Sequence, residues 1–226
     1  MEIKWLGHAS LVIEIGGKKI LVDPWFKTSK EPQRLVPSTV QLEDVQNCDL
    51  ILLTHEHHDH VDERAITQIH SKNLCQVIAP RNALNLLPEV TTRSKIPVTE
   101  GDDFNLLGLN IKVVPAKHPQ STHAVGFIVS SPREEKSIYL AGDTYDFTEM
   151  RDINVDVAVL PIGGLYTMDS ISAVTALKRM HAKYVIPIHF NTFKEITVNE
   201  RDFEKRVLAS TKTKPIILDL GEQVSI

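Results

Sequence analysis

The fold and the chemistry of this chain are decided by one stretch, Thr54-His55-Glu56-His57-His58-Asp59-His60. The stretch directly follows residues 49–53, whose continuous apolar run predicts a strand in the middle of a sheet. The loop that leaves the carboxyl end of such a strand is the usual place for a site in an open α/β sheet. The pattern His-x-His-x-Asp-His offers imidazole and carboxylate groups, which are the ligands that Zn²⁺ and similar divalent ions prefer. The stretch therefore predicts a metal site at the end of a central strand.

A purely structural interpretation of the same stretch is a polar loop in which Asp59 or Asp62 caps the next helix. This alternative explains one carboxylate but leaves the histidines without a role. Packing several imidazoles and a carboxylate beside a buried strand is costly unless a metal or another partner compensates them. The metal site is therefore the favoured interpretation.

The remaining sequence alternates between short apolar runs and amphipathic segments. Gly16-Gly17 predicts a hairpin turn, and the polar segment 27–44 predicts a long surface loop with a short helix after Ser38. Apolar and alternating runs predict strands at 3–6, 11–15, 19–22, 49–53, 76–79, 103–107, 109–115, 124–130, 136–140, 157–160, 184–188, 215–218 and 223–226. Helical periodicity and capping residues predict helices at 62–71, 82–87, 171–180 and 199–210. Two halves of similar content predict a single α/β domain over residues 1–226 with two packed sheets.

Composition excludes several classes of protein. The 226 residues are 42% hydrophobic and 24% charged, which is ordinary for a globular chain that buries a sizeable core. No apolar run is long enough to span a bilayer, and the first residues lack the features of a signal peptide, so we expect a cytoplasmic protein without membrane insertion. A net charge of −4 argues against a nucleic-acid partner. The ten histidines are the unusual feature, since the chain has only four tyrosines and two tryptophans.

The histidine stretch and further motifs resemble the metallo-β-lactamase superfamily. The motifs that carry the resemblance, in chain order, are Ile20-Leu21-Val22-Asp23-Pro24, the stretch 54–60, Val114-Pro115-Ala116-Lys117-His118, Tyr139-Leu140-Ala141-Gly142-Asp143-Thr144 and Val185-Ile186-Pro187-Ile188-His189. Leu6-Gly7-His8-Ala9 and Leu160-Pro161-Ile162-Gly163-Gly164, followed by Thr167-Met168, are similar to one branch of small metal-dependent hydrolases. That branch includes the L-ascorbate-6-phosphate lactonase-like proteins. The resemblance extends from about residue 1 to about residue 205.

The resemblance implies a fold and a ligand set. The implied fold is a metallo-β-lactamase-like four-layer αββα sandwich, in which two mixed sheets pack face to face with helices outside. The implied site holds two divalent metal ions, zinc or manganese, with iron as an alternative. His55, His57 and His118 would bind the first ion, Asp59, His60 and His189 would bind the second, and Asp143 would bridge both. Each ligand outside the stretch also ends an apolar run, so the predicted strand ends converge on one edge.

Several other residues are candidates for supporting roles. We expect Asp23 to orient a ligand histidine and His8 to lie at the rim of the site. Asp59 and Asp143 are candidates for proton transfer, and His123 for donating a proton to a leaving group. Adjacent glycines can present backbone N–H groups to an anion, so residues that follow two late strands are candidates for contacting an anionic substrate: Gly163, Gly164, Thr167 and Asn191. His70 and His181 have no partner in the sequence and are predicted to face solvent.

These predictions combine into a metal-dependent hydrolase. A hydroxide held by two metal ions would cleave an ester, lactone or phosphodiester bond of a small molecule. A redox enzyme with iron in the same site is one alternative, which the histidine at position 57 disfavours because diiron members of the superfamily tend to carry a carboxylate there. A non-catalytic, metal-stabilised binding or sensing module is the other, which the intact ligand set disfavours. A homo-oligomer is an expectation from the branch that the motifs resemble.

Overall fold

The computed structural model describes residues 1–26, 34–35 and 45–226. The loop predicted at 27–44, with its short helix after Ser38, therefore lies outside the described residues except at Arg34 and Leu35. Within the described residues, four α-helices are present, α1 (Glu63–Asn73), α2 (Arg81–Asn85), α3 (Ser170–Arg179) and α4 (Glu200–Ser210). The described part of the chain also contains three short 3₁₀ helices, η2 (Thr92–Ser94), η3 (Thr148–Asp152) and η4 (Lys194–Ile196).

The described strands form two mixed sheets of seven strands each. The first sheet has the order β14-β1-β2-β3-β4-β5-β6 and consists of β14 (Gln223–Ser225), β1 (Glu2–Gly7), β2 (Ser10–Ile15), β3 (Lys18–Val22), β4 (Leu50–Leu52), β5 (Gln76–Pro80) and β6 (Lys95–Val98). Its strands are antiparallel from β14 to β3 and parallel from β3 to β6.

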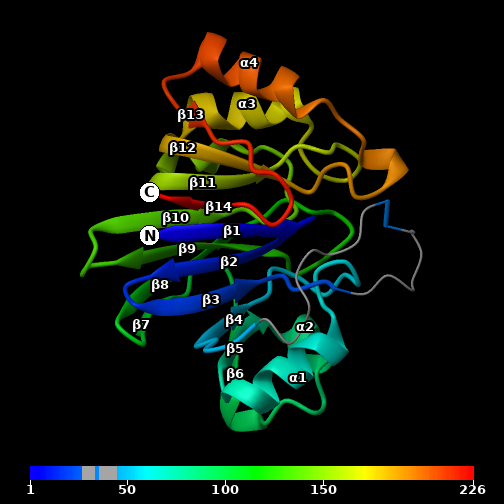
Figure 1. Ribbon diagram of the computed structural model, residues 1–226, viewed down its shortest axis with the longest axis vertical. Helices are drawn as coiled ribbons and strands as arrows, with labels where there is room; N and C mark the ends of the chain where they lie inside the picture. Colours follow the sequence, from blue (N-terminus) through cyan, green and yellow to red (C-terminus); the bar gives the residue numbers. More distant parts are fainter. Residues whose placement is uncertain (27–33, 36–44) are drawn as a thin grey trace.

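The second sheet has a matching organisation. Its order is β13-β12-β11-β10-β9-β8-β7, and it consists of β13 (Lys214–Pro215), β12 (His181–Ile188), β11 (Asn154–Pro161), β10 (Lys136–Leu140), β9 (Val125–Ser131), β8 (Leu109–Pro115) and β7 (Asp103–Leu106). The strands are parallel from β13 to β10 and antiparallel from β10 to β7. Figure 1 shows α3 and α4 beside β11–β13 at one end of the molecule and α1 and α2 beside β4–β6 at the other. The predicted sandwich of two mixed sheets with outer helices is confirmed.

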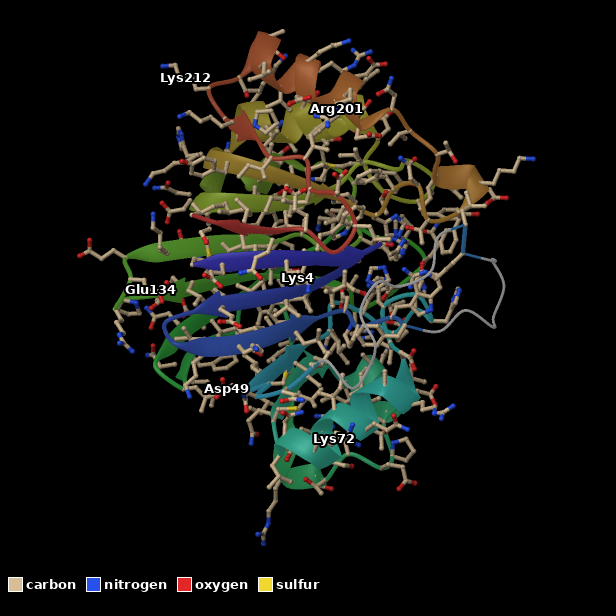
Figure 2. All side chains as sticks on the ribbon, viewed as in Figure 1. Lys4, Asp49, Lys72, Glu134, Arg201 and Lys212 are labelled. Atoms are coloured by element: carbon tan, nitrogen blue, oxygen red, sulfur yellow. The ribbon has the colours of Figure 1, made fainter. Side chains whose placement is uncertain are left out.

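The alternation of side chains along each strand explains this layering. In β1, Ile3 and Trp5 are buried in the large core that joins the two sheets, while Glu2 and Lys4 face outward. Figure 2 shows Lys4 on the outer face of β1. In β4 both faces are buried, because Leu50 and Leu52 join this core whereas Ile51 packs into a second cluster under α1. A continuous apolar run is what such a doubly covered strand requires, so β4 lies inside its sheet as predicted.

Two expectations from the sequence are wrong. The strand β6 was not predicted because Pro97 interrupts its pattern; β6 is the edge strand of its sheet, where a residue without an N–H is tolerated. His70 is buried rather than solvent-facing, and its Nδ1 lies 2.9 Å from the carbonyl oxygen of Cys75, to which it donates a hydrogen bond.

Asp62 is the N-cap of α1 and accepts from the backbone N–H of Ala65, which leaves Asp59 free of a capping role. No helix in the described part of the chain has the length and apolar character needed to cross a membrane.

Candidate metal centre

All seven predicted ligands lie at one edge of the two sheets, where neighbouring strands end. The stretch 54–60 follows β4, His118 follows β8, Asp143 follows β10 and His189 follows β12. The side chains of His55 and His60 are fully buried, and those of His118, Asp143 and His189 are almost so. The topology therefore gathers residues that are as much as 134 positions apart, from His55 to His189, because parallel strands end at the same edge of a sheet.

The first group of donors consists of His55, His57 and His118, whose facing nitrogens all lie within 4.8 Å of one another. His57 Nδ1 lies 3.0 Å from His55 Nε2 and 3.1 Å from His118 Nε2. Three imidazole nitrogens at these distances in a small space are arranged around a common point. This arrangement is the one that a tetrahedral ion with histidine ligands needs.

The other ring nitrogen of each histidine in this group contacts an oxygen. His57 Nε2 lies 3.2 Å from the carbonyl oxygen of Gln120, and His118 Nδ1 lies 3.2 Å from that of Tyr166. His55 Nδ1 lies 3.0 Å from the Thr54 hydroxyl oxygen. A carbonyl can only accept, and the Thr54 hydroxyl already donates to Asp23, so in the neutral form of each ring the proton sits on this outer nitrogen. The inner nitrogens then carry the lone pairs that bind a metal.

The second group of donors is centred on His60 and His189. His8, Asp59, His60 and His189 each offer one atom within 4.8 Å of the others, and His55, His60 and Asp143 form an overlapping set. Asp143 faces both groups. Towards the second group, its Oδ1 lies 3.3 Å from His60 Nε2 and its Oδ2 lies 3.2 Å from His189 Nε2. Towards the first group, the same Oδ2 lies 3.9 Å from His55 Nε2 and 4.0 Å from His118 Nε2.

Buried polar atoms without a partner test whether these residues fit a metal. Within the described residues, His60 Nε2, Asp143 Oδ1 and His189 Nε2 are buried and make no aligned hydrogen bond. A buried polar atom that is left unsatisfied costs about 1–3 kcal/mol, so three such atoms around one point need a common partner. A divalent cation satisfies all three at once, and nitrogen and carboxylate donors suit zinc or manganese. The residues therefore fit a metal centre.

Shifted pKa values place His55, His118 and Asp143 in the protonation states that bind a metal. Burial, together with the neighbouring His60, holds the pKa of His55 well below its usual value, and burial also lowers the pKa of His118. Burial alone would raise the pKa of Asp143, but His189 and His60 outweigh it and hold that pKa well below the usual range. Neutral imidazoles and an ionised carboxylate are the protonation states that a metal requires of its ligands.

His60 is the exception among the predicted ligands. Burial tends to lower the pKa of its imidazole, but the carboxylates of Asp143 and Asp23 outweigh burial and raise the pKa well above the usual value. A cation between two carboxylates is therefore stabilised at this position. A divalent ion in the same place would supply that positive charge and displace the proton from Nε2.

Asp23 lies directly behind the centre, at the end of β3. Its Oδ2 accepts from His60 Nδ1 at 2.9 Å and from the Thr54 hydroxyl at 2.6 Å, and its Oδ1 accepts from the Thr54 backbone N–H at 2.8 Å. The carboxylate thereby fixes the proton of His60 on Nδ1 and turns Nε2 towards Asp143. It also holds the hydroxyl that contacts His55, so one residue orients two ligand rings.

His8 lies under the centre rather than at its rim. The residue has a left-handed backbone (φ 56°), and its side chain is fully buried. Its Nε2 lies 3.2 Å from Asp59 Oδ2 and its Nδ1 lies 3.1 Å from the Thr192 hydroxyl. Burial, with a further contribution from His189, lowers the pKa of His8 to about 3. The neutral ring donates from Nε2 and so holds the carboxylate of Asp59 in place.

A cleft of about 540 Å³ opens directly above the predicted ligands. Asp59, His118, Asp143 and His189 form its floor together with His57. The walls come from residues that the sequence did not single out for this purpose, namely Gln120, Leu165, Tyr166, Phe193, Glu195 and Ile196, and from His58. Tyr166 and Phe193 each lie a few residues from a recognisable motif, and that proximity was the only signal in the sequence.

The residues predicted to contact substrate do not line this cleft. The backbone N–H of Gly164 donates to the Met168 carbonyl at 3.0 Å, and the hydroxyl of Thr167 donates to the Gly164 carbonyl at 3.0 Å, so both groups are used within their own turn. The side-chain oxygen of Asn191 accepts from the Val198 N–H at 2.8 Å. Gly163 packs against the backbone carbonyl of His189. These residues shape the loops around the centre.

His123 is not brought together with the metal ligands. The side chain is exposed and lies in a second pocket of about 520 Å³, where its Nδ1 contacts the Asn82 amide nitrogen at 3.1 Å and the Thr122 hydroxyl at 2.7 Å. A turn closed by the Ser121 N–H on the His118 carbonyl separates the two histidines. A proton donor must lie within hydrogen-bonding reach of the reacting group, and His123 does not line the cleft.

Comparisons with known proteins show which family and which fold this chain is similar to. A family model described as a beta-lactamase superfamily domain matches residues 2–189. The chain is 33% identical over its full length to a UPF0173 metal-dependent hydrolase from Pyrobaculum aerophilum, of which it also covers 100%. It is 36% identical to a protein of the same name from Caldivirga maquilingensis, over 89% of this chain and 87% of that protein. The structure of a metallo hydrolase from Ignicoccus hospitalis is similar, with a TM-score of 0.85 and 29% identity over 99% of this chain and 97% of that one.

Proposed function

This chain belongs to the UPF0173 family of metal-dependent hydrolases in the metallo-β-lactamase superfamily, and we propose that it cleaves an ester, lactone or phosphodiester bond of a small molecule at a centre of two divalent ions. The observation that carries the proposal is the pair of converging donor groups that share Asp143 beneath an open cleft. A merely structural metal site would be closed on all sides, whereas a catalytic one keeps an accessible position. The cleft supplies that access.

We assign the ligands from the motifs and the distances. His55, His57 and His118 would hold one ion, Asp59, His60 and His189 would hold the other, and Asp143 would contribute to both. The donor set suits zinc or manganese, with iron as an alternative. When bound, such ions lower the pKa of water towards neutrality and polarise the bond under attack.

Other residues around the centre orient these ligands, and one carboxylate accepts a proton during the reaction. The carbonyls of Gln120 and Tyr166 keep the protons of His57 and His118 on their outer nitrogens, and Asp23 does the same for His60. Asp59 lies in the floor of the cleft, and its Oδ2 is held by His8. We assign the Asp59 carboxylate as the group that accepts a proton during the reaction, because it faces the cleft and is ionised: burial opposes ionisation, but the hydrogen bond from His8 outweighs it and lowers the pKa of Asp59.

The bond and the substrate are the finer part of the proposal. The motifs at residues 6–9 and 160–168 are similar to those of the L-ascorbate-6-phosphate lactonase-like branch, which favours a lactone or a related ester. The cleft volume suits a small molecule rather than a polymer. Cleavage of an ester and of a phosphodiester can both be measured with chromogenic substrates.

The test is metal-dependent turnover with matched aspartate variants. Protein stripped by a chelator is assayed on 4-nitrophenyl esters and bis(4-nitrophenyl) phosphate, with and without added Mn²⁺ or Zn²⁺. We expect activity to depend on the added metal, and Asp143→Asn to lower it by at least about 10²-fold. Asp156→Asn is the control, since Asp156 is also a buried carboxylate and lies within β11 of the same sheet, but contacts Ser137 and Lys183 instead of the centre. Turnover without metal, or equal effects of the two variants, would contradict the proposal, and absence of all turnover would favour a non-catalytic binding module.

A further inference from the structure

The walls of the cleft are apolar at the point where a substrate enters. Leu165 and Tyr166 stand at the mouth and are 49% and 52% exposed, which is unusual for large apolar side chains. Phe193 and Ile196 form the deeper wall and are buried, and both pack with Trp25 in a small cluster beside the centre. The cleft therefore offers a continuous apolar surface from solvent to the metal ligands.

The loop that carries the two exposed side chains is held in a strained backbone. Gly164, Leu165 and Tyr166 all have left-handed backbone, with φ values of 71°, 43° and 70°. Such conformations cost residues other than glycine free energy and persist only where the surroundings enforce them, most often at functional sites. Here the Gly164 N–H donates to the Met168 carbonyl at 3.0 Å, and the Tyr166 carbonyl accepts from His118 Nδ1 at 3.2 Å. These two hydrogen bonds hold the loop in a conformation that leaves two apolar side chains at the mouth of the cleft.

The charges around the cleft disfavour an anionic substituent. The described residues that line the cleft include no lysine or arginine, and Glu195 places a carboxylate in the wall. The N–H of Gly164 and the hydroxyl of Thr167, which the sequence suggested as contacts for an anion, are used inside their own turn. A negative group placed away from the reacting bond would lose water without gaining a partner.

From these observations we infer that the substrate carries an uncharged, apolar substituent next to the bond that is cleaved, and that Leu165, Tyr166, Phe193 and Ile196 bind it. This inference rests on the proposed hydrolase function. The cleft of about 540 Å³ accommodates a substituent of about six carbon atoms together with the reacting group. Glu195 then excludes analogues whose substituent ends in a carboxylate.

Binding of hydroxamates, which chelate metals and resemble the reacting group, tests the inference without turnover. The metal-loaded protein is titrated calorimetrically with acetohydroxamate, hexanoyl hydroxamate and a hydroxamate of the same length that ends in a carboxylate. Burial of a methylene tightens binding about fourfold. We expect hexanoyl hydroxamate to bind at least tenfold more tightly than acetohydroxamate, and the carboxylate-ended compound to lose that gain.

Two variants and a matched control test whether Tyr166 and Glu195 cause the preference for an uncharged, longer chain. Tyr166→Asn keeps the backbone carbonyl and tolerates the left-handed conformation, so the ratio of the affinities for hexanoyl hydroxamate and acetohydroxamate should lose most of the gain from the longer chain. Glu195→Lys should improve binding of the carboxylate-ended compound relative to the hexanoyl compound by about tenfold. Glu89→Lys changes the net charge equally at an exposed residue that does not line the cleft, and should leave the ratio unchanged.

The outcomes separate this inference from the proposed function. Equal affinity for the three hydroxamates, or tighter binding of the carboxylate-ended one, would overturn the inference even if the protein hydrolyses esters. A chain-length preference that Tyr166→Asn removes would support the inference even if no ester or phosphodiester is turned over, in which case only the proposed hydrolysis fails. Failure of all three compounds to bind would overturn the inference together with the metal centre.

Discussion

Gly163 provides the sharpest test of how the fold positions the metal centre. A Cβ added at this residue would lie 2.2 Å from the backbone carbonyl oxygen of His189 and 2.9 Å from Ile196 Cβ. Ordinary contacts begin near 3.4 Å, so the two segments must separate by about 1.2 Å in Gly163→Ala. His189 is an assigned metal ligand. The atom that the new methyl group would meet is the backbone oxygen of His189, which cannot rotate away as a flexible side chain can.

Two separate effects follow from that displacement. Overpacking of this kind costs about 1–3 kcal/mol of stability. Because displacement also moves a ligand by an amount comparable to the tolerance of a catalytic centre, we expect metal affinity to fall on the order of 10–100-fold and turnover on the order of 10²-fold. The second effect is the one that reports on the centre.

Gly164→Ala is the matched control. The adjacent residue has φ 71°, so alanine there is strained by about 1–2 kcal/mol. Its added Cβ would meet nothing closer than Asp169 Cβ at 3.6 Å, so His189 need not move. Both variants should therefore lose stability, but only Gly163→Ala should lose metal affinity.

The assay measures both quantities on the same samples. Urea unfolding of the metal-free proteins gives the change in free energy of unfolding, and titration with Zn²⁺ or Mn²⁺ against a chelating indicator gives the affinity. If Gly163→Ala binds metal as tightly as Gly164→Ala at comparable stability, the contact between Gly163 and His189 does not position the centre, and the reasoning fails.

Four further predictions follow from particular contacts. Asp23→Asn should weaken metal binding about 10–100-fold in a chelator competition, because it removes the carboxylate that accepts from His60 Nδ1; an unchanged affinity would contradict that role. Tyr139→Phe should leave the free energy of unfolding unchanged or raise it by about 1 kcal/mol in urea titrations, since the buried hydroxyl has no partner among the described residues. For Asp156, burial opposes ionisation, but hydrogen bonds from Lys183 and Ser137 outweigh it and lower the pKa, so the carboxylate stabilises the fold above its unfolded pKa of about 3.9; this contribution is lost as the pH falls through the lower folded pKa. Asp156→Asn should then cost about 1–2 kcal/mol at neutral pH, mainly through Ser137 because the Lys183 amine is exposed, and a cost that persists in acid would refute the argument. His123→Ala should change kcat by less than about twofold, whereas loss of a proton donor would lower it by about 10²–10⁴-fold.

The convergence of the predicted ligands could be expected from the sequence because of where they stand relative to apolar runs. His118, Asp143 and His189 each follow a strand whose apolar pattern is clear, and the topology brings these strand ends to one edge. The same reasoning found β4, whose continuous apolar run reflects burial on both faces. It failed for β6, where Pro97 disguises an edge strand, and for the buried His70, whose partner is a backbone carbonyl that a residue pattern cannot reveal.

The substrate side of the centre was beyond sequence reasoning for physical reasons. The pattern Gly163-Gly164 suggested free N–H groups, but hydrogen bonding within the turn uses the N–H of Gly164. The exposure of Leu165 and Tyr166 depends on a left-handed backbone that such residues rarely adopt, so their identity gives no hint of it. His123 lies five positions from His118, yet the turn at Ser121 sends it to another pocket.

The loop at residues 164–166 contacts both the metal ligands and the substrate cleft. The left-handed backbone at Tyr166 turns its carbonyl inward, where it accepts from His118 Nδ1 and fixes the nitrogen that faces the metal position. The same conformation leaves the phenol ring at the mouth of the cleft. In the proposed site, the main chain of this residue orients a metal ligand, and its side chain contacts the substrate. Because the two roles use different atoms, the side chain at position 166 can change specificity without changing the ligand geometry, provided that the new residue tolerates a positive φ.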